Sequence, residues 1–284
     1  MVAFGQFILL TFHEPLGGGD VRKLVIIVTA VAMADGGLAV AADLPMKIPA
    51  YVSPAAATKN WTGFYISGSF GYGWGAEDNI LLFTDPAVTV PGAVPSSHSY
   101  DLNGFIGGGG VGYNYQFNDV ILGLEADFSY AHFAGSASRG GAFAPIGPPW
   151  GALLTSPYSY SQSAELDWLG TLRGRIGFTP VNDLLIYATG GFAFGRAKAT
   201  TLLTFPLVSF IGAASGTKTG WTAGGGAEYA LGERWSAKVE YLYYDLGSLL
   251  VDDVPIPSTP TFETWVDFPL HGSIVRVGLN YKLN

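Results

Sequence analysis

The stretch NWTGFYISGSFGYGWG, residues 60–75, alternates large and small side chains. One alternate set is Phe64, Ile66, Gly68, Phe70, Tyr72 and Trp74, and the other is Tyr65, Ser67, Ser69, Gly71 and Gly73. Successive side chains of a β-strand point to opposite faces, so a period of two predicts a strand. This strand has one aromatic face and one nearly bare face, and the rest of the chain must explain what each face contacts.

The composition excludes several classes of protein. The chain has 284 residues, 49% of them hydrophobic, and only 13% are charged, which is about half of the share in soluble proteins. No stretch has the roughly 20 consecutive apolar residues of a membrane helix, so the apolar residues are distributed at short period, as in membrane β-strands. The net charge of −8 argues against nucleic-acid binding. Because cysteine is absent, disulfides and thiolate metal sites are excluded.

The N-terminal region resembles an export signal. Arg22 and Lys23 precede an apolar segment, residues 24–34, that is too short to span a bilayer. The Ala-x-Ala sequence that follows predicts cleavage between Ala41 and Ala42.

These features predict four parts of the chain. A basic start at residue 22 implies that translation begins at Val21, whereas a single long signal is the alternative. The Pro- and Ala-rich segment before the first strand is typical of a flexible leader. The expected parts are a mis-annotated extension at 1–20, a signal peptide at 21–41, a leader at 42–59 and a β-barrel at 60–284.

Period-two alternation recurs eight times. The segments are Thr62–Gly75, Asp101–Phe117, Val120–Ala134, Ser163–Phe178, Leu184–Lys198, Thr219–Leu231, Arg234–Leu246 and Gly272–Leu283. Short turns near residues 118, 182 and 232 alternate with four long connections. This arrangement predicts an all-β, eight-stranded, antiparallel up-and-down barrel, because closure removes the exposed edges of a sheet.

The residue types on the two faces orient the predicted barrel. A soluble lipocalin-like barrel would carry many Lys and Glu residues outside, but the polar face here is mostly Gly, Ser, Thr and Ala. Small residues suit the narrow interior of an eight-stranded barrel, and aromatic girdles mark the two interfaces of a barrel in lipid. The expected lipid-facing aromatic girdle comprises Phe64, Phe70, Tyr72, Trp74, Trp168, Trp221, Trp235, Tyr241 and Tyr281.

Several of these segments resemble one known family. They are NWTGFYISGSFGYGWG, LDWLGTLRGRIGF, LLIYATGGFAFG, GWTAGGGAEYAL, WSAKVEYLYYDLG and HGSIVRVGLNYKL. The chain is similar over residues 60–284 to the small outer-membrane β-barrel proteins of α-proteobacteria, the porin-family group that includes RopB-type and surface-immunogen proteins. The resemblance implies an OmpA-like transmembrane barrel in the bacterial outer membrane.

The resemblance also implies the partners of the protein. They are outer-membrane lipid and lipopolysaccharide and, during biogenesis, the barrel-assembly machinery. Family members usually end in an aromatic residue that this machinery reads, whereas this sequence ends in Leu283 and Asn284, although Tyr281 keeps the alternation. This departure bears on assembly efficiency rather than on the fold.

Charged residues on the predicted lumen face form the main candidate site. They are Glu125, Asp127, Asp167, Arg173, Arg175, Glu228, Lys238, Glu240 and Arg276. Buried charges must pair, and adjacent strands should bring Arg173 or Arg175 to Glu125 or Asp127, and Arg276 to Glu240. We interpret the set as a structural salt-bridge plug. A narrow polar pathway for small ions is the alternative, and catalysis is disfavoured because a substrate could not reach the mid-barrel.

Other polar residues give weaker signals. His132 and Ser136 invite comparison with lipid-modifying barrel enzymes, and His98 and His271 at loop ends leave haem capture open. Neither set has ligand or triad spacing, so no cofactor, metal or catalytic residue is predicted. Acidic residues of the expected loops could collect divalent cations that bridge to lipopolysaccharide, although plain solubility is the simpler interpretation; they are Glu77, Asp78, Asp85, Asp252, Asp253, Glu263 and Asp267.

We therefore expect a non-enzymatic outer-membrane barrel. Its expected role is envelope integrity and surface display, with weak porin-like passage of small solutes left open. A ligand-binding barrel, for example for haem, or a lipid-modifying enzymatic barrel is the competing class.

Overall fold

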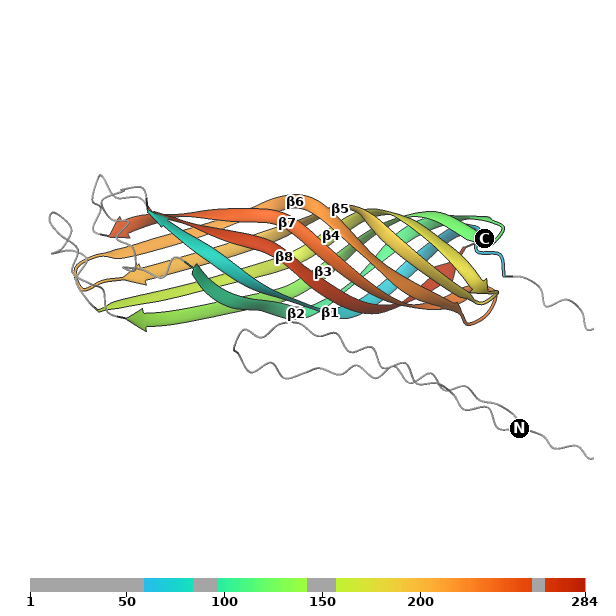
Figure 1. Cartoon of the computed structure of the whole chain (residues 1–284), viewed down its shortest axis with the longest axis horizontal. Helices are drawn as coiled ribbons and strands as arrows, with labels where there is room; N and C mark the ends of the chain where they lie inside the picture. The colour runs from blue at the N-terminus through green and yellow to red at the C-terminus, as the bar shows by residue number, and fades with distance from the viewer. Residues whose placement is uncertain (1–58, 84–96, 142–156, 257–263, 284) are drawn as a thin grey trace, which may run out of the picture. The chain divides into compact units, whose positions relative to one another are not determined.

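The protein, described from a computed structural model, forms one barrel of eight antiparallel strands (Figure 1). The structure describes residues 59–83, 97–141, 157–256 and 264–283. The expected extension, signal peptide and leader up to residue 58 lie outside the described residues, as do Asp85 and Glu263. The strands are β1 (Gly63–Phe83), β2 (Ser97–Phe117), β3 (Val120–Gly141), β4 (Tyr158–Val181), β5 (Leu184–Thr204), β6 (Ser209–Ala230), β7 (Trp235–Ile256) and β8 (Thr264–Lys282).

The strands follow one another around the barrel in chain order, and β8 closes on β1. Closure pairs Ile66 with Tyr281 and Phe70 with Val277 across the β1–β8 seam. The predicted up-and-down barrel is therefore confirmed. No helix among the described residues is long and apolar enough to cross a membrane.

The strands are longer than the sequence pattern predicted, mainly at the end opposite the short turns. The expected long connection between the fifth and sixth strands is wrong: β5 and β6 continue as a hairpin, and only residues 205–208 join them. The reason is that the alternation persists, with Ala197, Ala199 and Leu203 pointing inward and fully buried. Likewise, the acidic residues expected in loops at 77–78, 252–253 and 267 lie within strands.

The aromatic face of each strand points outward. Seven of the nine girdle residues are exposed, while Trp168 and Tyr281 are half-covered by neighbouring rings. On β5 the outward apolar band runs from Leu184 to Phe194, about 34 Å along the strand. At a tilt of about 40° this is about 26 Å along the barrel axis, close to the apolar band of about 25 Å in outer-membrane barrels.

A β-bulge in β4 changes which residues face the lumen. The register pairs Leu166 with Ala197 but Trp168 with Arg196, so Asp167 is the extra residue. From Leu169 to Gly177 the odd-numbered residues of β4 point inward. From Tyr158 to Leu166, on the other side of the bulge, the even-numbered residues point inward. Uninterrupted alternation over residues 163–178 would place Leu166 on the lipid face with Trp168 and Leu172, but its side chain lies inside the barrel and is 1% exposed.

Candidate functional site

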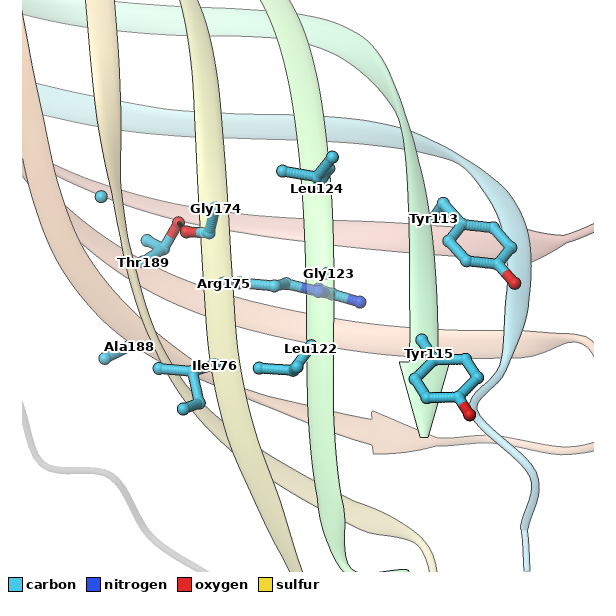
Figure 2. A pocket seen from close by; sticks show the side chains of 11 residues that line it. Tyr113, Tyr115, Leu122, Gly123, Leu124, Gly174, Arg175, Ile176, Ala188 and Thr189 are labelled. Carbon is cyan, nitrogen blue, oxygen red and sulfur yellow. Dashed lines mark hydrogen bonds between the residues drawn. The ribbon is translucent and has the colours of Figure 1, made fainter. Parts of the chain in front are cut away.

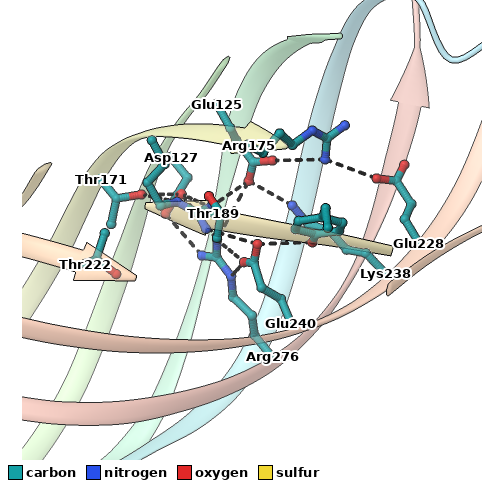
Figure 3. Close-up of polar contacts among 12 residues, drawn as sticks. Glu125, Asp127, Thr171, Arg175, Thr189, Thr222, Glu228, Lys238, Glu240 and Arg276 are labelled. Carbon is teal, nitrogen blue, oxygen red and sulfur yellow. Dashed lines mark hydrogen bonds and ion pairs between the residues drawn. The ribbon is translucent and has the colours of Figure 1, made fainter. Parts of the chain in front are cut away.

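Eight of the nine charged residues predicted for the lumen come together inside the barrel (Figure 3). Four are basic and four are acidic, so the set carries no net formal charge. All are almost fully buried. We call this set the charge network; its members are Glu125, Asp127, Arg173, Arg175, Glu228, Lys238, Glu240 and Arg276.

Arg173 is the hub of the charge network. Its Nη2 donates to Glu125 at 2.9 Å and to Asp127 at 2.8 Å, and its Nη1 donates to Glu240 at 3.0 Å. Its Nε donates to Thr171 at 2.9 Å. Since the register places Glu125 directly opposite Arg173, the expected β3–β4 contact is present. A planar guanidinium can serve three carboxylates at once because its donors diverge in a fixed fork.

Arg276 and Lys238 close the network on the other side of the lumen. Arg276 lies opposite Glu240 in the β7–β8 register, and its Nε donates to that carboxylate at 2.6 Å. Its Nη1 also reaches Asp127 at 3.1 Å, while Lys238 Nζ lies 2.9 Å from Glu125. Each of these three carboxylates therefore has at least two cationic partners, which offsets the cost of burial.

Arg175 lies between two tyrosine rings. Its guanidinium carbon is 4.8 Å from the ring centre of Tyr65 and 5.2 Å from that of Tyr187, and its Nη1 is 3.2 Å from Glu228. Both tyrosines face a glycine: a Cβ at Gly112 would fall on the Tyr65 ring, and one at Gly226 would crowd the Tyr187 ring. Glycines on the inner face of the barrel therefore make room for large inward side chains from neighbouring strands.

Asp167 is the one predicted member that the structure places elsewhere. The bulge turns it away from the network, and its carboxylate lies 2.8 Å from Lys198 and 3.9 Å from Arg196 on the outer wall. The expectation that Asp167 is a lumen charge is therefore wrong. A single extra residue shifts the alternation by one, and nothing in the local sequence marks where it occurs.

A large apolar core fills the lumen between the charge network and the end of the barrel opposite residues 59–62. The sequence analysis did not predict it. Its inward side chains come from β2 to β8 and are nearly all fully buried; the largest are Tyr100, Leu102, Phe133, Tyr160, Leu166, Leu203, Phe210, Leu242, Tyr244, Phe268 and Ile274. The signal was present in β7, where alternation continues through Leu242, Tyr244 and Leu246 and places apolar residues on the inner face.

Residues 59–62 cover the other end of the lumen. Trp61 is 5% exposed and packs with Ile121, Leu185 and Tyr187. The segment is tied down by hydrogen bonds from Trp61 N to Gln116 and from Lys59 Nζ to the carbonyl of Glu233, each 2.8 Å. Lys59, assigned to the flexible leader from sequence, is thus attached to the barrel.

His98, His132 and His271 lie on three different strands, β2, β3 and β8. His132 and Ser136 both lie on the outer face of β3, so neither faces the lumen. His271 lies opposite Asp245 in the register and near the Tyr243 ring, and His98 lies opposite Asn79. Within the described ranges, no group of three or more His, Asp or Glu side chains is arranged to hold a metal ion.

Comparison with known proteins agrees with this architecture. Residues 48–282 match the model of a family described as outer membrane protein beta-barrel domain. The chain is 35% identical over 261 residues to the 31 kDa outer-membrane immunogenic protein of Brucella melitensis, covering 90% of this chain and 98% of that protein. It is 26% identical to the 25 kDa outer-membrane immunogenic protein of Brucella abortus, over 92% and 98% of the two chains.

A more distant relative and a solved structure extend the comparison. The 22 kDa outer membrane protein of Rhizobium leguminosarum is 26% identical over 69% of each chain. The crystal structure of the outer membrane protein OprG from Pseudomonas aeruginosa covers 80% of this chain and 99% of its own, with 15% identity and a TM-score of 0.44.

The aromatic outer wall, the closed eight-stranded barrel and these relatives lead to one conclusion. The chain belongs to the outer membrane protein beta-barrel domain family, among the outer-membrane proteins of α-proteobacteria, and resides in the bacterial outer membrane.

Proposed function

We propose that the protein is a closed barrel that contributes to envelope integrity and displays surface segments, and that it neither conducts solutes nor acts as an enzyme. The observation that carries this proposal is that three successive layers occupy the lumen. Trp61 covers one end, the charge network fills the middle, and the apolar core fills the remainder.

The charge network opposes conduction because its charges are already matched. An ion that crossed this layer would have to replace buried contacts such as Arg173–Asp127 at 2.8 Å and Arg276–Glu240 at 2.6 Å. Separating a buried pair leaves an uncompensated charge in a medium of low dielectric.

The apolar core opposes conduction independently of the charge network. Fully buried side chains such as Phe133, Leu203 and Phe268 offer no polar partner to a hydrated ion. The barrel would therefore remain closed even without the charges. Surface display is supported by the Brucella relatives, whose names describe them as outer-membrane immunogenic proteins.

Planar-bilayer recording of the refolded protein tests this function. We expect no stepwise conductance from the native chain, and none from the double variant Arg173→Met, Glu240→Gln, because the apolar core remains. The variant Phe133→Ser, Phe268→Ser, added to that double variant, should produce discrete channels. Steady channels from the native chain would overturn the closed-barrel proposal in favour of the porin-like alternative.

A further inference from the structure

A small cavity lies at the end of the barrel that the short turns form, between the charge network and the cover formed by residues 59–62. Besides the cover, it is lined by the ends of β1, β2, β6, β7 and β8. Its volume of about 20 Å³ accommodates one particle of about the size of a water molecule. Asn60 and Arg234 line it and are exposed, so a small solute can enter it from the surrounding solution.

Two buried side chains that line the cavity have unused hydrogen-bonding groups. Trp61 is 5% exposed and Asn280 is 2% exposed. Within the part of the chain that the structure describes, the Nε1 of Trp61 and both polar side-chain atoms of Asn280 have no hydrogen-bond partner. Because buried polar groups are nearly always satisfied, these atoms indicate a bound particle that accepts hydrogen bonds from the indole and the amide. A water molecule or a small anion would do so, and the surrounding charges distinguish the two.

The charges around the cavity favour an anion. Three cations line it, namely Lys59, Arg234 and Lys282. They donate to neutral oxygen atoms, which are backbone carbonyls and a tyrosine hydroxyl. The one carboxylate that lines the cavity belongs to Glu228, and its two oxygens are engaged by the hydroxyl of Ser236 and by Arg175 at 3.2 Å. The negative charge is therefore offset inside the protein, whereas the cations at the rim leave the cavity positive.

Arg175 adds positive charge directly behind the cavity. Figure 2 shows its side chain leaving β4 and passing Gly123 of β3, where a Cβ would fall 2.8 Å from the Cγ of Arg175. Its Nε donates to Asn114 at 2.7 Å, and its guanidinium carbon lies 4.8 Å from the ring centre of Tyr65; both residues line the cavity. Its Nη2 has no hydrogen-bond partner among the described residues. The cavity therefore has cations on its inner side as well as at its rim.

We propose that this cavity binds one small monoanion of the size of chloride, which accepts hydrogen bonds from the indole of Trp61 and the amide of Asn280 and pairs with the ammonium of Lys282. The Nζ of Lys282 donates to the carbonyl of Asn60 at 2.8 Å, and an ammonium has two further donors. The anion joins the cover to the last strand, so it stabilises this end of the barrel by mass action. This inference does not depend on whether the lumen conducts.

Nuclear magnetic resonance of the refolded chain, labelled with ¹⁵N at tryptophan and held in neutral detergent micelles, tests the proposal. Chloride replaces gluconate at constant ionic strength, because gluconate is too large for the cavity. We expect the indole N–H signal of Trp61, assigned from its loss in Trp61→Phe, to shift and to saturate. The indole signal of Trp235, which is exposed on the outer wall, should not move. An unchanged Trp61 signal, as a water in the cavity predicts, would overturn the proposal, and so would an equal shift at Trp235.

Stability gives a second measurement of the same site. A ligand that binds only the folded chain raises the ratio of folded to unfolded protein in proportion to its saturation. With chloride at ten times its Kd, this ratio should be about tenfold higher than in gluconate, as measured by urea unfolding at equal ionic strength. Bromide is of similar size and should reproduce the gain. Equal ratios in chloride and gluconate would contradict a stabilising anion.

Charge variants separate this site from a general effect of salt. Lys282→Gln removes a charge-assisted contact, so the affinity for chloride should fall about tenfold or more. Asn280→Asp is nearly isosteric and places a carboxylate in the cavity, so the chloride-dependent shift of Trp61 should disappear. Arg139→Gln removes the same charge from an exposed position at the other end of β3 and should leave the affinity unchanged.

The variants remain decisive if one of them fails to fold. Lys282 lies at the partly exposed end of β8, so Lys282→Gln keeps the barrel core intact and decides the question if the buried Asn280→Asp does not fold. Equal losses of affinity in Lys282→Gln and Arg139→Gln would show a general salt effect and contradict the assignment. Full retention of the Trp61 shift in Lys282→Gln would exclude Lys282 as the partner of the anion.

Discussion

Arg173 on β4 and Glu240 on β7 form a 3.0 Å ion pair although their strands are not neighbours in the barrel. The contact therefore crosses the lumen rather than following the wall. Arg276 extends the crossing from Glu240 to Asp127 on β3. The charge network thus joins strands that backbone hydrogen bonds do not join, and it fixes the cross-section of the barrel.

The first prediction concerns this crossing. Arg173→Met should lower the free energy of unfolding by about 3–5 kcal/mol, because it leaves several buried carboxylates short of a partner. Adding Glu240→Gln removes one of those carboxylates, so the double variant should lose less than the sum of the two single variants. Urea unfolding in lipid vesicles measures all three values, and strict additivity would show that the two side chains do not act together.

The second prediction compares the two faces of the wall. Leu172 and Val239 point outward near the middle of the band, so replacing either by Arg should cost about 2–4 kcal/mol in lipid. Ser67→Ala on the lumen face should cost much less. Thr189→Ala loses one hydrogen bond to the carbonyl of Gly174, about 1 kcal/mol. Similar costs on the two faces, from the same vesicle-based unfolding, would mean that the faces are exchanged.

The third prediction tests the β4 bulge. Leu166 lies inside and Leu172 lies outside, although both are even-numbered residues of one strand. Leu166→Ala should lower the free energy of unfolding by about 2–5 kcal/mol because it opens a cavity in the apolar core. Leu172→Ala is the matched control, since lipid can fill the space, and it should cost clearly less. A larger loss from Leu172→Ala would place the bulge elsewhere.

The fourth prediction concerns the cover formed by residues 59–62. Trp61→Ala should destabilise the barrel by about 3–5 kcal/mol, because its ring packs on Leu185 and Tyr187. Conductance should stay absent, since the charge network and the apolar core are unchanged. Lys59→Ala, at the exposed rim, is the milder control. Unfolding and bilayer recording of the same preparations distinguish a loss of packing from the opening of a channel.

The sequence predicted the barrel because its alternation is strong wherever one face meets lipid. Residues 64–74 show this clearly, and the strand positions of Glu125 and Arg173 then followed from adjacency in a meander. The register that places Glu125 directly opposite Arg173 could not be predicted, because a period-two pattern does not determine which residues of two strands pair. The network's cross-lumen contacts, such as Arg173–Glu240, could not be read from neighbouring strands at all.

Two other features escaped prediction for physical reasons. Beyond the membrane band the outer face of a strand no longer meets lipid, so the contrast between the two faces weakens and the predicted strands ended too early. Leu203 and Phe210 show this, since both belong to a hairpin that was expected to be a loop. The bulge at Asp167 was missed because one extra residue leaves the composition unchanged while reversing the faces of all residues beyond it.

The length of the β5–β6 hairpin beyond the apolar band has a mechanical consequence. From Arg196 to Thr204, β5 continues for about 27 Å, or about 20 Å along the barrel axis at a tilt of about 40°. The apolar core stiffens this extension from within. The barrel wall therefore holds the connection at residues 205–208 about 20 Å beyond the end of the apolar band on β5. Phe205 and Val208 of this connection belong to the apolar core, so the tip of the hairpin is anchored by the same packing that stiffens the wall.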